Sequence, residues 1–466
     1  MWARIKGTIN RLKSTAKGRT KERRRLRDQL KYSRKRISWL EAENERLSRI
    51  ACPQPVFNHK YPAQMIALAV FIVLHGGSLR CASAAAQFLA RLMGWSLTDR
   101  PSPTTVRNWV LRCGLHSLQR VRDWRGEIVL IIDESIQIGT EKLLLLLGLP
   151  LNKDQSRCTP LTSRDVQVLG MEVQHSWTGE LIADFLQRTL AGFPNLNPAY
   201  FISDRGSSLL SAIRRLGYSW VSDCSHEMMN AVKDIFNNDK ALQDLCAAIG
   251  TLRSRFLLTG WGGLLPATLR DKDRFLRLFT IVDWVRRLDS YWDRLPGKVR
   301  PNLSFYRRQP ALLRRLNQVR DLVEITAKLL KAAGLSRATH RRWQQQVTSY
   351  LNQQAVVTHA ARKFIVRLEA YFANHAPKYE TQGRLLCCSD IIESTFGRYK
   401  NKGGMKTISA DVLSIALYNQ PLSMDFVVQA MGCISQPQLN AWEEKNVCHN
   451  YFGLRRRLDQ MLKTTG

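Results

Sequence analysis

The stretch Glu127-Ile-Val-Leu-Ile-Ile-Asp133 indicates the fold class at the centre of this 466-residue chain. Its run of aliphatic and β-branched side chains is typical of a buried strand, and the run stops at an acid. A second stretch, Ala199-Tyr-Phe-Ile-Ser-Asp204, ends in the same way. Since an apolar run gains nothing by stopping on a carboxylate, we expect Asp133 and Asp204 to lie at neighbouring strand ends and to serve a function there.

Other elements are predicted around these two strands. Short apolar runs and period-two alternation predict strands at 143–149, 165–175 and 218–222. Helical periodicity predicts helices at 179–190 and 207–216. The order along the chain is therefore three strands, a helix, a strand, a helix and a strand, which predicts an α/β core.

A strong positive charge limits the classes of partner. The chain has 71 Lys and Arg against 38 Asp and Glu, a formal net charge of +33, so a polyanion is expected. The longest apolar stretch, Met65 to Leu74, is about half of the roughly 20 residues that span a bilayer. The start of the chain has no apolar leader, and the ten cysteines show no CxxC pair. We therefore expect a nucleic-acid-binding protein of the cytoplasm, associated with the nucleoid.

Residues 1–52 are predicted to form a basic arm and a short coiled coil. A heptad pattern begins in this segment, with Leu26, Ser33, Leu40 and Leu47 at d positions and Leu30, Ile37, Asn44 and Ala51 at a positions. A polar Asn44 at an a position favours a two-stranded state, and the basic run Lys21–Arg27 lies just upstream. We expect a homodimer that presents two positive arms, and the alternative is a solvated helix that packs on its own chain.

Residues 53–124 are predicted to form a helical DNA-binding domain of the helix-turn-helix type. Prolines 53 and 55 end the first helix, a further helix is expected at 79–93, and Ser102 or Thr104 would cap a third. On the third helix the residues expected to face inward are Val106, Trp109, Val110 and Cys113. The residues expected to face outward, where they would contact base edges and phosphates, are Arg107, Asn108 and Arg112. An ordinary capped surface helix is the alternative.

The region 230–385 is basic and helical in pattern, with helices expected at 275–295, 312–333 and 340–375. We interpret it as an all-helical insertion into the α/β core. Trp261, flanked by glycines, is a candidate for stacking on an extruded base, whereas Trp284 is expected in the core. Residues 411–466 are predicted to be a helical tail that ends near a basic run, Arg455–Arg457.

A third carboxylate, Glu393, lies in the predicted amphipathic helix Asp390–Lys400. Two strand-end aspartates and one helix glutamate are what a ribonuclease H-like core needs to hold two divalent cations about 4 Å apart. Asp390 is the main rival for the third position. Glu134 is a rival or a helper beside Asp133.

The order Asp133, Asp204, Glu393 resembles that of the DDE transposases, with separations of 71 residues (204 − 133) and 189 residues (393 − 204). The segment Asp223-Cys-Ser-His226 resembles the C/D-x-x-H signature of many such enzymes. Glu393 and Lys400 have the spacing of the Glu and Lys in the Tyr-Arg-Glu-Lys signature of one group of insertion-sequence transposases. The Tyr and Arg positions of that signature hold Leu386 and Ser389, so this match is partial.

The resemblance covers about residues 125–410 and implies a ribonuclease H-like catalytic core at 125–229 and 386–410, interrupted by the helical insertion. It implies two Mg²⁺ ions, with Mn²⁺ as a substitute, bound by the three acids. Asp223 and His226 would support the site, with a neutral His226 able to accept a proton or bind a phosphate oxygen. The residues expected to contact DNA phosphates are Lys400, Arg398 and Arg205.

The expected partners are the terminal inverted repeats of a mobile element, the target DNA, and further copies of the chain. Two other function classes stay open. A DNA-binding regulator would use the basic N-terminal segments without the acids. A ribonuclease H-like, structure-specific nuclease would cut branched DNA without joining ends.

Overall fold

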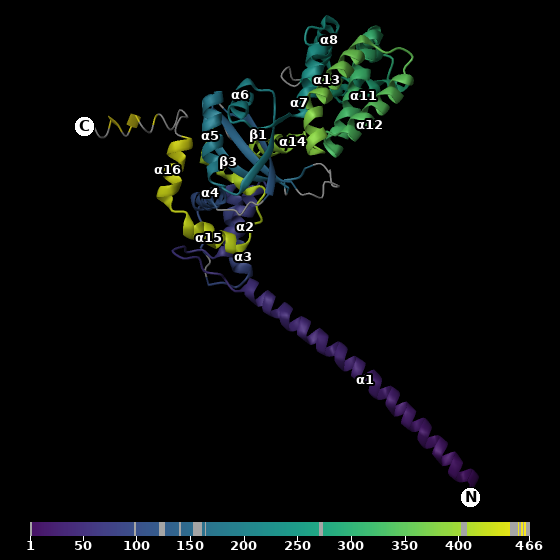
Figure 1. The fold of residues 1–466 in the computed structure, drawn as a ribbon, viewed down its shortest axis with the longest axis vertical. Helices are drawn as coiled ribbons and strands as arrows, with labels where there is room; N and C mark the ends of the chain where they lie inside the picture. The colour runs from purple at the N-terminus through teal and green to yellow at the C-terminus, as the bar shows by residue number, and fades with distance from the viewer. Residues whose placement is uncertain are drawn as a thin grey trace. The chain divides into compact units, whose positions relative to one another are not determined.

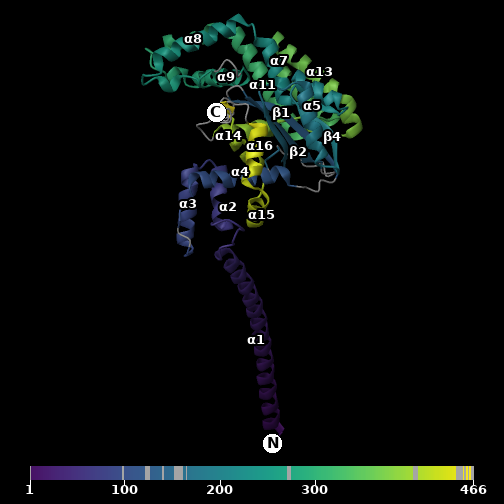
Figure 2. The same cartoon turned by 90° about the vertical axis from the view of Figure 1, so that its left-hand side faces the viewer.

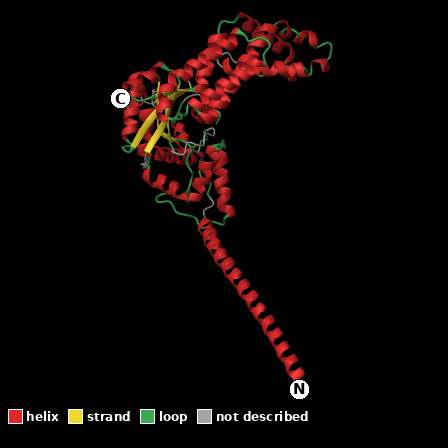
Figure 3. Cartoon of the chain, turned by 45° about the vertical axis from the view of Figure 1, so that its right-hand side comes forward, coloured by secondary structure: helices red, strands yellow, loops and turns green. Residues whose placement is uncertain are grey.

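A computed structural model describes residues 2–96, 99–120, 126–138, 141–151, 161–163, 165–269, 274–401 and 408–447, with 455, 458, 459, 461 and 462. The fold is mixed α/β and largely helical (Figure 3). The chain divides into two compact units. One comprises Met1–Trp109 with Leu422–Gly432, and the other comprises Val110–Pro421 with Cys433–Gly466.

The second unit contains a five-stranded mixed sheet. Its strands are β1 (Gly126–Ile138), β2 (Glu141–Pro150), β3 (Gln167–Gln174), β4 (Leu196–Ser203) and β5 (Trp220–Ser222). The strand order is β3-β2-β1-β4-β5. β1–β2 and β2–β3 pair antiparallel, and β1–β4 and β4–β5 pair parallel. Each predicted strand overlaps an observed one, so the predicted order of strands and helices is confirmed.

The expectation that Asp133 ends its strand is wrong. β1 continues to Ile138 because it pairs with β2 beyond Asp133, with a shift of register between Asp133 and Ile136. Pairing of β1 with β4, by contrast, stops at Ile131. Asp133 therefore lies past the end of the parallel ladder but inside the antiparallel one. Asp204 directly follows β4, as predicted.

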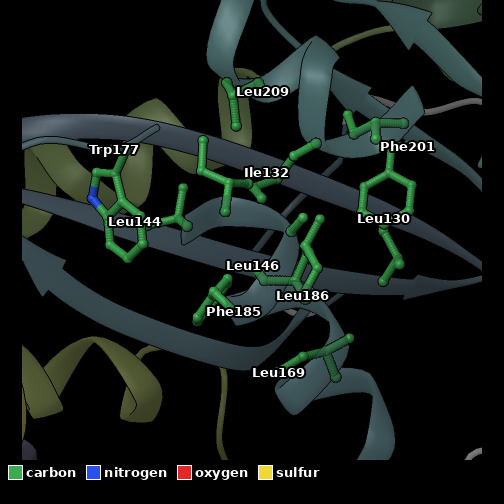
Figure 4. Packing of buried hydrophobic residues seen from close by; sticks show 14 of the residues in the cluster. Leu130, Ile132, Leu144, Leu146, Leu169, Trp177, Phe185, Leu186, Phe201 and Leu209 are labelled. Carbon is green, nitrogen blue, oxygen red and sulfur yellow. The ribbon is translucent and has the colours of Figure 1, made fainter. Parts of the chain in front are cut away.

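Helices α5 (Gly179–Ala191) and α6 (Ser207–Arg215) pack against one face of the sheet. Their buried side chains join alternate residues of β1, namely Ile128, Leu130 and Ile132, in one apolar cluster (Figure 4). Successive side chains of a strand point to opposite faces, so Asp133 belongs to the other face. Helix α14 (Asp390–Lys400), which carries Glu393, contacts β1.

The described part of the predicted insertion is helical, with one isolated bridge between Leu335 and Leu385. The helices are α7 (Cys224–Phe236), α8 (Lys240–Phe256), α9 (Arg274–Ser290), α10 (Arg300–Leu303), α11 (Pro310–Ala333), α12 (Arg337–Asn352) and α13 (His359–Gln382). Figures 1 and 2 show α11 and α13 close together, and the two helices are in contact. The predicted boundary at residue 230 falls inside α7. Trp284 is buried, as expected.

The single helix predicted at 340–375 is two helices, α12 and α13. The break forms because Thr358 caps α13, with its hydroxyl accepting from the Ala361 amide at 3.2 Å. The buried side chain of Gln318 satisfies the connecting backbone. Its amide nitrogen donates to the Val356 carbonyl at 2.7 Å, and its oxygen accepts from the Thr358 amide at 2.9 Å.

The first unit contains α1 (Trp2–Ala51), α2 (Ala63–Leu74), α3 (Leu79–Leu92), the start of α4 (Pro103–Gln119), and α15 (Met424–Cys433). α1 ends before the two prolines, as predicted. The heptad residues Leu26, Leu30, Ile37 and Leu40 are exposed. These four residues therefore do not pack on the rest of the chain, as the alternative required. The side chains of Leu47 and Ala51 lie outside the described part.

The later part of α4 packs within the second unit against the 3-10 helix η4 (Ala410–Leu417) and near the start of α16 (Gln436–Asn446). Gly114 permits this approach, because a Cβ at that position would meet the Leu413 carbonyl oxygen at 2.4 Å. The basic residues Lys402, Lys406, Arg456 and Arg457 lie outside the described residues. Among the helices that are described, none has the length and apolar character needed to cross a bilayer.

Candidate active site

The three predicted acids come from three elements of the second unit. Asp133 is a buried residue of β1, Asp204 follows the neighbouring parallel strand β4, and Glu393 is in the first turn of α14. Glu393 keeps about half of its side chain exposed, at 56%. These three residues are called the acidic cluster below.

The pKa of Asp133 is shifted by its burial and by the other members of the acidic cluster. Burial is the main cause that raises the pKa of Asp133 to about 7, and the charge of Asp204 raises it further. His226 acts in the opposite direction, and Glu393 adds a smaller increase. Mutual repulsion of carboxylates in a buried place is the behaviour expected of a site that binds cations.

His226 lies beside the acidic cluster. Its Nε2 is 3.4 Å from Oε1 of Glu393. This hydrogen bond is the main cause that raises the pKa of His226 to about 9, against the effect of burial and with help from Asp223, Asp204 and Asp133. This raised pKa favours a protonated ring at pH 7, so the role of a neutral His226 stays a prediction.

The acidic cluster is more open than a site for one ion. Among the described residues, the potential ligand atoms that all lie within 4.8 Å of one another belong to Asp223, Cys388 and Asp390, so the three predicted acids are spread more widely. Local hydrogen bonds hold two of them. Asp204 Oδ1 accepts from the Gly206 amide at 2.8 Å, and Asp133 Oδ1 accepts from the Glu134 amide at 2.7 Å.

Asp390 and Glu134, the alternative candidates for metal-binding acids, each interact with a lysine. Asp390 binds Lys331 and accepts from the Ser225 hydroxyl at 2.8 Å. Burial alone would raise the pKa of Asp390, but these hydrogen bonds outweigh it and the pKa is lowered. Glu134 lies 3.7 Å from Lys142 Nζ, and burial raises its pKa. The compact group around Asp390 is therefore already neutralised by Lys331.

Asp223 is a fully buried cap of α7. Its Oδ1 accepts from the His226 amide at 2.7 Å, which gives the Asp-x-x-His spacing a structural reason. Its Oδ2 accepts from the Ser389 hydroxyl at 2.8 Å and from the Ser389 amide. Ser389 was not predicted as a site residue, since a serine just before a helix gives no signal beyond ordinary capping.

The residues expected to contact DNA differ in their availability. Lys400 is exposed, seven residues beyond Glu393 on the same helix. The Arg398 guanidinium lies 4.3 Å from the ring centroid of Tyr418. Arg205 forms an ion pair with the buried Glu227. Trp261 is half-buried, with Lys298 Nζ 5.8 Å from its ring centroid.

The burial pattern of the third predicted helix of the 53–124 segment is confirmed only for its inward face. Val106, Trp109, Val110 and Cys113 are buried, as expected. Arg107, Asn108 and Arg112, expected to face outward, are only half-exposed. Burial lowers the pKa of Arg112, so this guanidinium is partly withdrawn from water by its packed neighbours. Base contacts by these three residues stay a prediction.

Comparison with known proteins gives no match, either to a protein-family model or to a curated protein. The functional interpretation therefore depends on the geometry of the site.

Proposed function

We propose that the chain is a DNA transposase with a ribonuclease H-like core, in which the acidic cluster holds a pair of divalent cations. The observation that carries this proposal is that Asp204, which follows β4, and Glu393, from α14, lie near enough to the buried Asp133 of β1 for their charges to raise its pKa. The strand order, the helical insertion before α14 and the net charge of +33 support it.

The donor set fits Mg²⁺, or Mn²⁺ as a substitute. Mg²⁺ takes oxygen ligands at about 2.1 Å, so two oxygens on one ion lie within about 4.2 Å of each other. Two ions about 4 Å apart need a wider set of carboxylates, which agrees with the open spacing of the acidic cluster. Asp133, Asp204 and Glu393 would together hold the ions. When bound, such ions activate the attacking oxygen and stabilise the leaving oxygen of a phosphodiester.

The remaining residues position the acids and the DNA. Asp223 fixes the starts of α7 and α14, and the His226 imidazolium orients Glu393 through their hydrogen bond. Lys400 is placed on the same helix face as Glu393, where an ammonium group would bind a phosphate of the strand being cut. The site of action implied is the nucleoid.

The proposal assigns α1 to self-association. Continued toward the start of the chain in the predicted register, the heptad pattern takes in four more exposed residues, Leu12, Ile9, Ile5 and Trp2. Arg23 falls at an a position, so a basic stretch separates two apolar ones. In a parallel pair, g and e positions of opposite charge face each other at Glu22 with Arg27 and at Arg36 with Glu41. A second copy of the chain is therefore the partner that this helix fits.

Cleavage and joining test the proposal directly. Labelled duplex carrying the inverted repeats that flank the gene is incubated with the full chain and Mg²⁺ or Mn²⁺, then pre-cut ends are offered with target DNA. Asp133→Asn, Asp204→Asn and Glu393→Gln are expected to abolish nicking and joining while DNA binding stays nearly intact. Asp184→Asn, an exposed acid of α5, is the matched control and should cut normally.

The outcomes separate the three function classes. Joined product made by the wild type and by Asp184→Asn, but not by the three cluster variants, supports a transposase. Binding that is indifferent to metal and produces no nicks indicates a regulator. Cutting of branched DNA without joining indicates a structure-specific nuclease. Robust cutting by any cluster variant removes that residue from the assignment.

A further inference from the structure

A basic cavity of about 450 Å³ lies in the second unit, and Arg205, the residue after Asp204, is part of its lining. Arg205, Arg214 and Lys378 line it, together with Leu210, Trp220 and His375. These residues come from α6, β5 and α13 and from the turn after β4. The volume is within the roughly 300 to 1,000 Å³ that small-molecule pockets occupy.

Two of the three cations are held in place by the fold. Arg205 is paired with Glu227, which is 2% exposed and does not line the cavity. Lys378 Nζ donates to the Trp220 carbonyl and lies 5.9 Å from the centroid of the Trp220 ring. The indole is itself fixed, because its Nε1 donates to the Ser203 hydroxyl at 2.8 Å. The cavity therefore has a preorganised positive wall.

Arg214 and Lys378 supply positive charge that no carboxylate among the described residues balances. Among the described residues no carboxylate pairs with this exposed guanidinium, nor with the ammonium of Lys378. The neighbouring Arg215, by contrast, binds Glu180 at 3.1 Å. A cavity with a surplus of guanidinium and ammonium groups is suited to a phosphoryl group, which accepts several charge-assisted hydrogen bonds at once.

The lining of the cavity also includes residues suited to an uncharged ring. Leu210 and the half-buried indole of Trp220 present apolar surface. The imidazole of His375 is buried, with Nε2 2.9 Å from the Ser222 hydroxyl, while Nδ1 has no hydrogen-bond partner among the described residues. A ligand that carries both a phosphate and a flat aromatic group would use both the basic and the apolar lining residues.

We infer that this cavity binds one nucleotide unit, either as a free nucleotide or within a DNA strand that passes the acidic cluster. The phosphate is bound by Arg205, Arg214 and Lys378, and the base lies against Trp220. The inference rests on the proposed function only for the second source, since Asp204 and Arg205 are consecutive and a strand held here would be near the acids.

Equilibrium binding to the full chain tests the inference. A deoxynucleoside monophosphate and a labelled single-stranded deoxyoligonucleotide are titrated separately, in EDTA and at a salt concentration that suppresses non-specific contacts. Arg214→Gln is expected to weaken binding of at least one probe about tenfold, as loss of a charged hydrogen-bond donor predicts. Arg215→Gln removes the same charge from the same helix but not from the cavity, and should bind like the wild type.

The two probes distinguish the two sources. A loss confined to the oligonucleotide assigns the cavity to a strand, and a loss with the free nucleotide assigns it to a soluble ligand. Equal affinities of the two variants for both probes, or no binding of either probe by the wild type, overturn the inference. Since no cleavage is scored and no metal is present, Asp133→Asn must bind like the wild type, so failure of the proposed function does not affect this result.

Discussion

Asp223 accepts hydrogen bonds from both the amide and the hydroxyl of Ser389, 166 residues later in the chain. Through this contact the start of α7, which carries His226, is joined to the start of α14, which carries Glu393. A backbone hydrogen bond from the Cys224 amide to the Cys387 carbonyl, at 2.7 Å, adds a second connection. One buried carboxylate therefore positions two residues of the candidate active site.

Replacing Asp223 by Asn should lower both stability and cleavage. An amide has one acceptor oxygen, so it cannot serve the His226 amide and the two Ser389 donors from opposite sides. We expect the free energy of unfolding to fall by about 2 kcal/mol, measured by urea denaturation, with a parallel loss of nicking. Ser389→Ala removes only the hydroxyl donor and should cost about 1 kcal/mol. Wild-type stability of Asp223→Asn would show that this contact does not hold the two helices.

Metal binding should release protons at neutral pH. With a pKa of about 7, roughly half of the Asp133 carboxyl groups are protonated at pH 7 in the metal-free protein, and they must ionise to bind a cation. The His226 proton is retained below pH 9 only while Glu393 and the other acids face it. Calorimetry with Mn²⁺ in buffers of different ionisation enthalpy measures the number released.

The number of protons released on metal binding should change with pH and with substitution of His226. The number of protons that Asp133 releases on metal binding should fall as pH rises from 7 to 9, because its carboxyl group is then already ionised. His226→Gln should abolish proton release from His226 and increase release from Asp133 at pH 7, because the imidazolium no longer lowers the pKa of Asp133. A binding heat that does not change with the buffer at pH 7 would contradict the convergence of the acidic cluster.

Self-association through α1 predicts a charge-sensitive dimer. Ile37→Glu places a carboxylate in the apolar seam and should weaken dimerisation about a hundredfold or more, since an unpaired buried charge costs several kcal/mol. Ser38→Glu, the adjacent residue outside the seam, should leave the dimer intact. Sedimentation equilibrium measures both. Dyes attached to the first residues of the two chains should show strong energy transfer if the helices are parallel. A monomeric wild type would disprove self-association through α1.

Two helical glycines should respond in opposite directions to alanine. Gly114→Ala in α4 would place its Cβ 2.4 Å from the Leu413 carbonyl oxygen, and the forced separation of α4 and η4 should cost about 1 to 3 kcal/mol. Gly250→Ala in α8 meets nothing within 4 Å, so it should gain about 0.5 to 1 kcal/mol of helix stability. Thermal or urea unfolding of both variants checks the pair. Equal effects would exclude a close approach at Gly114.

Local patterns were enough to predict most elements of the sheet and its helices. The apolar run Ile128–Ile132, for example, was predicted as a strand and is a buried part of β1. Local patterns gave wrong predictions where residues distant in the chain determine where an element ends. Asp133 does not end its strand because β2 continues to pair beyond it, and the helix at 340–375 breaks because Gln318, from another helix, binds the connecting backbone.

The sequence by itself determined the α/β class, the positive charge, the order of the three acids and the apolar stripe of α1, because each follows from the residues and their order without knowing which distant residues meet. Only the tertiary structure decided that His226 lies beside Glu393, that Asp390 binds Lys331 and that Ser389 donates to Asp223. Charge and hydrogen bonding act through space over a few ångströms. The partners of these groups are therefore chosen by how distant elements pack, which no local pattern encodes.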